Sequence, residues 1–207
     1  MRHFNISEPL LDSTRQMFKD LENDARDTKI DLGIGIYRDE KGEAPVFKAV
    51  KKAESILYQN EKSKSYKTPA GNSEYCKNIL DLVLGKDILA ERKDKVGAIQ
   101  IPGAGSGLRI AGELIKNNVQ NRLISIPDPT WGQQPFMFEK AGLKISKHSY
   151  YNEQNNFLDF DNMINDLNKL KSGDSLLLHG CCHNPTGADL SLEQWEQVAN
   201  ICVKKGI

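Results

Sequence analysis

The chain has 207 residues, of which 39 % are hydrophobic and 27 % are charged, which is ordinary for a globular protein and long enough to bury a substantial core. Twenty-eight Lys and Arg residues balance 28 Asp and Glu residues, and the sequence has no long block of like charges, so we expect neither a nucleic-acid partner nor binding to anionic lipid. The hydrophobic runs are far shorter than the roughly 20 residues of a membrane span. The first residues contain no apolar core of a secretory signal, so we expect a cytoplasmic protein.

The four cysteines are Cys76, Cys181, Cys182 and Cys202. Two are adjacent, which is typical of neither a disulfide framework nor a C-x-x-C metal pair. We therefore expect reduced thiols and no bound metal.

The first part of the chain predicts three amphipathic helices and one extended segment. Apolar residues at helical spacing predict a helix from Ser7 to Lys29, with Ser7 and Pro9 suited to its start. Ile30, Leu32, Ile34 and Ile36 alternate with other residues and predict a strand up to Tyr37, in which Gly33 and Gly35 indicate close backbone approach. Further helices are predicted from Val46 to Leu57 and from Asn72 to Leu84, where Gly85 is a stop signal.

From residue 96 onwards, strand and helix patterns alternate, which predicts a parallel α/β sheet with helices on both faces. The predicted strands are Val96–Ile101, Leu123–Ile126, Leu143–Ser149 and Ser175–His179, and the predicted helices are Gly107–Lys116, Gln134–Ala141 and Asp159–Leu170. Ser191 and Gln194 form an S-x-x-Q capping box that opens a last helix. A further strand is expected after Gly206, and without it we expect this helix to expose apolar surface.

A glycine-rich loop, Gly103-Ala-Gly-Ser-Gly107, lies between a predicted strand and a helix. Its unhindered amides and the helix N-terminus suit an anion such as phosphate. The loop does not match G-x-G-x-x-G and lacks the lysine of a P-loop, so a tight structural turn is an equally good interpretation.

Trp131 lies just past the second regular strand, in Asp128-Pro-Thr-Trp-Gly132. Open α/β sheets bind ligands at this carboxyl edge, where an indole can stack on an aromatic ligand ring. The alternative is a tryptophan that packs in the core or against the loop.

The segment from His179 to Gly187 follows the fourth regular strand and therefore reaches the same edge. Asn184 supplies an amide donor on a backbone constrained by Pro185. A zinc site would need Cys181 and Cys182 together, but adjacent side chains point to opposite sides of an extended segment. A polar turn with buried thiols is the remaining alternative.

These loops belong to an ordered set of five motifs that resembles class I aminotransferases, in particular the aspartate/aromatic branch. The motifs are Asp31–Glu40, Tyr66–Gly71, Gly103–Gly107, Pro127–Gly132 and His183–Gly187. The resemblance covers nearly all of the chain and about the amino-terminal half of such an enzyme. It implies a fold type I large domain, incomplete here, over residues 46–207, preceded by an N-terminal arm and part of a small domain over residues 1–45.

The resemblance implies pyridoxal 5′-phosphate as the cofactor and an amino acid and a 2-oxo acid as substrates. Ala104 and Gly105 match residues whose amides hold the cofactor phosphate, although relatives more often have a hydroxyl residue where Gly105 stands. Trp131 matches a residue that stacks on the pyridine ring, and Asn184 matches one that bonds the ring's phenolic oxygen. Both also match substrate-binding positions, as does Gly35.

Tyr66 matches a tyrosine that reaches the phosphate of the neighbouring subunit, which implies a homodimer. The peptides before Pro129 and Pro185 match cis peptides. Gln134 stands where many relatives have a histidine that supports the aspartate behind the ring.

The family's Schiff-base lysine, its aspartate and its arginine match no residue of this chain, because they come later in the family's sequences. No catalytic residue is therefore assigned, and we expect the 207-residue chain to be inactive alone. The main alternative is a non-catalytic fragment or interaction module that associates with a complementary half or a homologue. A nucleotide-binding protein that uses the loop at Gly103–Gly107 is a weaker one, since no acidic residue is well placed to bind a ribose.

Overall fold

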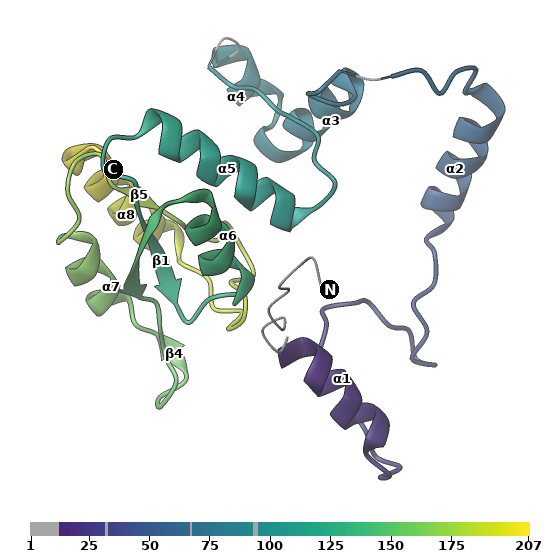
Figure 1. The fold of residues 1–207 in the computed structure, drawn as a ribbon, viewed down its shortest axis with the longest axis horizontal. Helices are drawn as coiled ribbons and strands as arrows, with labels where there is room; N and C mark the ends of the chain where they lie inside the picture. Colours follow the sequence, from purple (N-terminus) through teal and green to yellow (C-terminus); the bar gives the residue numbers. More distant parts are fainter. Residues whose placement is uncertain (1–12, 32, 67, 93–94) are drawn as a thin grey trace, which may run out of the picture. The chain divides into compact units, whose positions relative to one another are not determined.

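The computed structural model describes residues 13–31, 33–66, 68–92 and 95–207 (Figure 1). It divides into two compact units, Met1–Tyr66 and Lys67–Ile207. The domain boundary that we predicted between residues 45 and 46 stays a prediction. The two units divide the chain by its internal contacts and do not test a family domain boundary. None of the helices in the described ranges combines the length and the hydropathy needed to span a bilayer.

The first unit contains helices α1 (Ser13–Asn23) and α2 (Lys48–Asn60). The helix predicted from Ser7 to Lys29 is confirmed only in its middle. Its start lies outside the described residues, and it ends at Asn23 because the next carboxylate, Asp24, accepts the backbone N–H of Arg26 at 2.9 Å. Helix α2 matches its prediction and buries none of its side chains.

The strand predicted from Ile30 to Tyr37 does not form, and Leu32 lies outside the described residues. A strand needs a hydrogen-bonded neighbour. In the described part of this segment the backbone turns on itself instead, since the N–H of Ile36 donates to the carbonyl of Ile34 at 2.8 Å.

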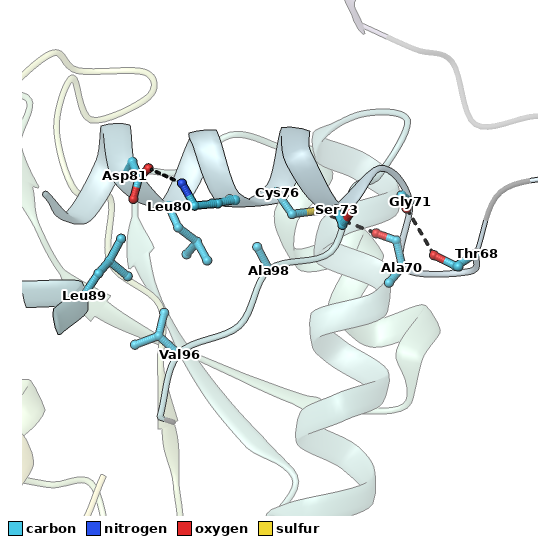
Figure 2. A pocket seen from close by; sticks show the side chains of 11 residues that line it. Thr68, Ala70, Gly71, Ser73, Cys76, Leu80, Asp81, Leu89, Val96 and Ala98 are labelled. Atoms are coloured by element: carbon cyan, nitrogen blue, oxygen red, sulfur yellow. Dashed lines mark hydrogen bonds and ion pairs between the residues drawn. The ribbon is translucent and has the colours of Figure 1, made fainter. Parts of the chain in front are cut away.

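The second unit begins with α3 (Ser73–Leu84) and α4 (Lys86–Glu91). Asn72 caps α3 by accepting the N–H of Tyr75 at 3.1 Å, and Gly85 ends it with φ of 78°, as predicted. Helix α4 was not predicted, because its six residues are too few to show a helical period. Figure 2 shows a cavity of about 420 Å³ between these helices and the segment from Val96 to Ala98.

The strand predicted from Val96 to Ile101 is also absent. Its hydrogen bonds go to the loop before α3. The N–H of Gln100 donates to the carbonyl of Ala70 at 2.9 Å, and its side-chain oxygen accepts the N–H of Asn72 at 2.9 Å.

The central sheet has the order β2-β1-β5 and is entirely parallel, which confirms the predicted fold class. Its strands are β1 (Leu123–Asp128), β2 (Lys144–Ser149) and β5 (Ser175–Leu176). The last is shorter than predicted. A small antiparallel hairpin of β3 (Tyr151–Asn152) and β4 (Phe157–Leu158) was not predicted, because two-residue strands carry no readable alternation.

Helices cover both faces of the sheet, as predicted (Figure 1). Helices α5 (Ala104–Asn118) and α6 (Gln133–Ala141) pack over a core of Ile124, Ile126, Phe138 and Leu143. Helices α7 (Phe160–Leu167) and α8 (Leu192–Lys205) enclose Tyr150, Met163, Leu167, Leu190 and Val198 on the other side. A Cβ on Gly112 would lie 2.6 Å from Cβ of Ala141, so α5 and α6 approach closely at this glycine.

The predicted capping box of α8 is present, with Ser191 and Gln194 bonding each other's backbone N–H. Leu192 and Val203 on α8 are 85 % and 84 % exposed, in agreement with the expected exposed apolar surface. The helix ends at Gly206 in a left-handed conformation.

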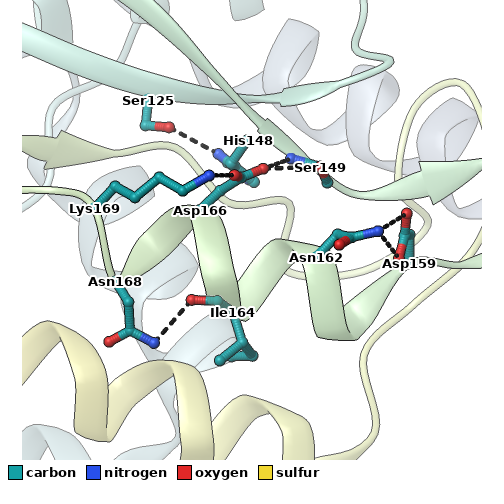
Figure 3. A network of polar contacts seen from close by, with 9 residues as sticks. All are labelled: Ser125, His148, Ser149, Asp159, Asn162, Ile164, Asp166, Asn168 and Lys169. Carbon is teal, nitrogen blue, oxygen red and sulfur yellow. Dashed lines mark hydrogen bonds and ion pairs between the residues drawn. The ribbon is translucent and has the colours of Figure 1, made fainter.

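A polar network lies on the α7 side of the sheet (Figure 3). The hydroxyl of Ser125 lies 3.0 Å from Nδ1 of His148, and both residues are 1 % exposed. Asp166 of α7 accepts the backbone N–H of Ser149 at 2.9 Å and the Lys169 ammonium at 2.7 Å. Burial alone would raise the pKa of Asp166, but these bonds lower it to about 2.

Candidate functional site

The glycine-rich loop forms the start of α5. Gly103 precedes the helix and provides no side-chain cap. The first amides of a helix have no partner within it, and they carry partial positive charge. The hydroxyl of Ser106 donates to the carbonyl of Gly103 at 2.8 Å. Its proton is therefore engaged within the loop, and the backbone amides of the first turn, including those of Ala104 and Gly105, are available to an anion.

Trp131 lies in the loop between β1 and α6 and is partly buried. The loop leaves β1 at Asp128, and its Asp128–Pro129 peptide is cis, as predicted. The carbonyl of Trp131 accepts the backbone N–H of Gln134 at 2.9 Å, which ties the loop to the first turn of α6.

Asn184 lies in the loop that follows β5, and the Asn184–Pro185 peptide is also cis, as predicted. The carboxylate of Asp189 holds this loop by accepting the backbone N–H of Cys182 at 2.9 Å and of His183 at 3.1 Å. These two bonds lower the pKa of Asp189. Within the described residues the side-chain amide of Asn184 makes no hydrogen bond, so it can serve a ligand.

Gln134 and His179 join the loops of Trp131 and Asn184. The buried side chain of Gln134 contacts Nε2 of His179, with its own nitrogen at 2.8 Å and its oxygen at 3.1 Å. On the other side of the ring, Nδ1 of His179 accepts the backbone N–H of Asn184 at 3.1 Å. Burial lowers the pKa of His179, which favours the neutral ring that this pattern requires.

The His183 ring also holds the loop that carries Asn184. It stacks on Tyr150 at 3.8 Å and on His179 at 4.5 Å between centroids. Nδ1 lies 2.8 Å from the Thr186 hydroxyl, while the buried Nε2 has no hydrogen-bond partner in the described chain. Burial, helped by neighbouring His179, lowers the pKa of His183 to about 4.

The start of α5 lies against α6, the helix that begins after Trp131. A Cβ built on Gly105 would be 3.4 Å from the terminal methyl of Met137, which is tight but movable. The structure therefore joins the Trp131 loop to the Asn184 loop through Gln134, and α5, which begins in the glycine-rich loop, packs against α6.

Gly35 and Tyr66 belong to the first unit, whereas the three loops belong to the second. A Cβ on Gly35 would meet nothing within 4 Å, and the Tyr66 side chain is 91 % exposed. Their roles in binding substrate and cofactor stay predictions.

Cys182 is not in extended backbone. It has φ of 51°, in the left-handed region, so the assumption that this cysteine pair lies in an extended segment was wrong. Among the described residues no group of three or more His, Cys, Asp or Glu side chains could hold a metal ion. Both thiols are exposed rather than buried.

The residues at the three loops fit a phosphorylated aromatic ring. Open helix amides suit the phosphate, and a partly buried indole offers a face to the ring. The free carboxamide of Asn184 suits a ring oxygen. No residue of these loops lines the cavity of Figure 2, whose lining residues lie between Thr68 and Ala98.

Residues 27–207 match the sequence profile of the family described as aminotransferase class I and II. The chain belongs to this family. It is 40 % identical to the aspartate aminotransferase of Escherichia coli over 183 residues, which are 88 % of the chain and 46 % of that protein. It is 38 % identical to the aromatic-amino-acid aminotransferase of Pseudomonas aeruginosa, over 86 % of the chain and 45 % of that protein.

Solved aminotransferase structures share the fold. An aromatic amino acid aminotransferase from Psychrobacter sp. B6, cocrystallised with aspartic acid, superimposes with a TM-score of 0.91 at 33 % identity, over 97 % of this chain and 50 % of that one. One from Burkholderia pseudomallei, covalently bound to pyridoxal phosphate, gives a TM-score of 0.90 at 29 % identity, over 99 % and 51 %. The chain spans about half the length of the aminotransferases it matches.

Sequence reasoning missed the residues that hold the aminotransferase loops in place. Gln134 was noted only for its place in the family pattern, and His183 only as the first residue of a motif. Asp189 was not singled out. A carboxylate shortly after a turn with two unpaired amides is a common local bridge, and this spacing is the signal that could have found it.

Proposed function

We propose that this chain provides the cofactor-binding part of an aminotransferase that moves an amino group between aspartate or an aromatic amino acid and a 2-oxo acid. The observation that carries the proposal is the bridge from Gln134 through His179 to Asn184. It ties together two loops that end neighbouring parallel strands, which is where α/β sheets bind ligands. Bound pyridoxal 5′-phosphate would supply an electron sink for the reacting amino acid.

The phosphate of the cofactor would be held by the backbone amides of Ala104 and Gly105. The engaged hydroxyl of Ser106 supports this assignment to the main chain. Because the amides are fixed by the helix, they need no side-chain ordering on binding.

Trp131 would cover one face of the cofactor ring and exclude water from it. The carboxamide of Asn184 would donate to the ring oxygen, and the bond from Asn184 N–H to His179 would fix the direction of that donation. Gly35 would approach the substrate carboxylate with its backbone, and Trp131 and Asn184 would also contact the substrate.

The covalent attachment of the cofactor needs a lysine in a desolvated site. No lysine of the 207-residue chain is assigned to it, so we infer that the chain does not transaminate by itself.

A homodimer, with Tyr66 reaching the phosphate of a second subunit, is part of the proposal. A cytoplasmic location is supported by a relative from Oryza sativa, which is described as a cytoplasmic aspartate aminotransferase.

Titration with pyridoxal 5′-phosphate and, separately, with NAD tests this function. We expect saturable binding of the first, competition by inorganic phosphate, and no binding of NAD. Binding of NAD alone would favour the nucleotide-binding alternative. Turnover of aspartate by the pure 207-residue chain would refute the inference of inactivity.

The second candidate is a non-catalytic module that associates with a complementary half or a homologue. The exposed apolar side chains of α2 and α8 favour it. Size-exclusion chromatography distinguishes the two, since a monomer at all concentrations would argue against obligatory association.

A further inference from the structure

Cys181 and Cys182 form an exposed pair of free thiols that the proposed cofactor chemistry does not use. Adjacent α-carbons are only about 3.8 Å apart. In extended backbone the two side chains would diverge, but the left-handed φ of 51° at Cys182 removes that alternation.

The loop that carries the pair is held on both sides. Asp189 accepts the backbone N–H groups of Cys182 and His183, and the His183 ring is buried against Tyr150 and His179. The backbone at Cys182 is therefore held before any ligand binds. Preorganisation of this kind lowers the entropic cost of chelation.

The two thiols also influence each other. The charge of Cys181, with a smaller contribution from the charge of Asp189, raises the pKa of Cys182. A raised pKa lowers the thiolate fraction at neutral pH and so slows reactions that require a thiolate, such as alkylation.

We propose that Cys181 and Cys182 together chelate trivalent arsenic of the arsenoxide class. In the reaction with phenylarsine oxide, both S–H bonds and the arsenic–oxygen bond break, and two S–As bonds form. The oxygen leaves with the two protons as one water molecule. Arsenic stays trivalent, so no oxidant or reductant is needed. Sulfur is the soft ligand that such an element prefers.

Phenylarsine oxide added to the intact 207-residue chain tests this proposal, with thiols counted by a chromogenic disulfide after unfolding. We expect one arsenical per chain and a fall in free thiols from four to about two, because a chelate consumes two thiols. A dithiol such as 2,3-dimercaptopropanol should restore all of them, while a monothiol at equal thiol concentration should not. Loss of one thiol per arsenical would overturn the proposal.

Two single variants and a matched double variant locate the site. Cys181→Ser and Cys182→Ser should each weaken binding by about 100-fold or more, because the second bond is no longer intramolecular. The double variant Cys76→Ser/Cys202→Ser should bind as the original chain does. Circular dichroism confirms that each variant is folded. Unchanged binding in Cys181→Ser, or loss of binding in the double variant, would refute the assignment.

Discussion

The side chain of Gln134 bridges two loops by contacting Nε2 of His179 at 2.8 Å and 3.1 Å. Because Nδ1 of His179 accepts the N–H of Asn184, the ring proton lies on Nε2. That proton can be donated only to the Gln134 oxygen. The bridge therefore selects one tautomer of His179 and one orientation of the glutamine amide.

Replacement of this glutamine should loosen both loops. Gln134→Ala leaves the partly buried Nε2–H of His179 without its acceptor, which costs about 1–3 kcal/mol of unfolding free energy. Gln133→Ala is the matched control, because Gln133 is exposed in the same turn of α6. Urea unfolding measures both, and equal stabilities of the two variants would contradict the bridge.

The contact between α5 and α6 should tolerate no side chain at Gly112. A Cβ there would lie 2.6 Å from Cβ of Ala141, which belongs to a helix and cannot move away freely. Gly112→Val should therefore destabilise the fold by about 1–3 kcal/mol or more.

Ala111→Val provides the control for Gly112→Val, since it places the same side chain at the exposed neighbouring position of α5. It should cost less than about 1 kcal/mol, as expected from helix propensity alone. Thermal unfolding compares the two variants. A Gly112→Val protein as stable as the control would show that the helices are not closely packed there.

Two buried histidines should make stability depend on pH in a defined window. Burial lowers the pKa of both His148 and His183 from 6.5 to about 4. Around His148, Asp166 and Asp128 oppose the shift, while the other histidines strengthen it. As pH falls below 6.5 the unfolded chain takes up protons that the folded chain refuses.

Stability should therefore be constant above about pH 6.5 and decline towards pH 4, by at most about 1.4 kcal/mol per pH unit for each histidine. Urea unfolding across this range gives the slope. His148→Gln should reduce the slope whatever it does to stability at neutral pH. Asp166, with its pKa of about 2, acts only at lower pH. An unchanged slope in the variant would show that His148 is not the group responsible.

The parallel sheet and its covering helices were predictable because their residues carry long, regular periods. Helix α8 was anticipated almost to the residue from Ser191 and the glycine at 206. Residues 30–37 alternate and residues 96–101 are mostly apolar, as in true strands, but a strand depends on a neighbour. The described backbone groups of both segments form hydrogen bonds elsewhere. Local pattern contains no information about that neighbour.

Local features of the candidate site were predictable, such as the helix after the glycine-rich loop and the cis peptide before Pro185. The supporting contacts were not predictable. Gln134 and His179 are 45 residues apart, and their pairing follows from the register of β1 and β5 and the position of α6. Only the folded arrangement reveals that this glutamine and this histidine form a hydrogen bond.

Amide chemical-shift mapping with pyridoxamine 5′-phosphate tests the central claim most directly. This form of the cofactor carries the ring and the phosphate but no aldehyde, so it cannot label surface lysines. We predict saturable shifts of the Ala104 and Gly105 amides, of the Trp131 indole N–H and of the Asn184 side-chain amide, all with one dissociation constant. Shifts confined to other residues, or different constants for the three loops, would contradict a single shared site.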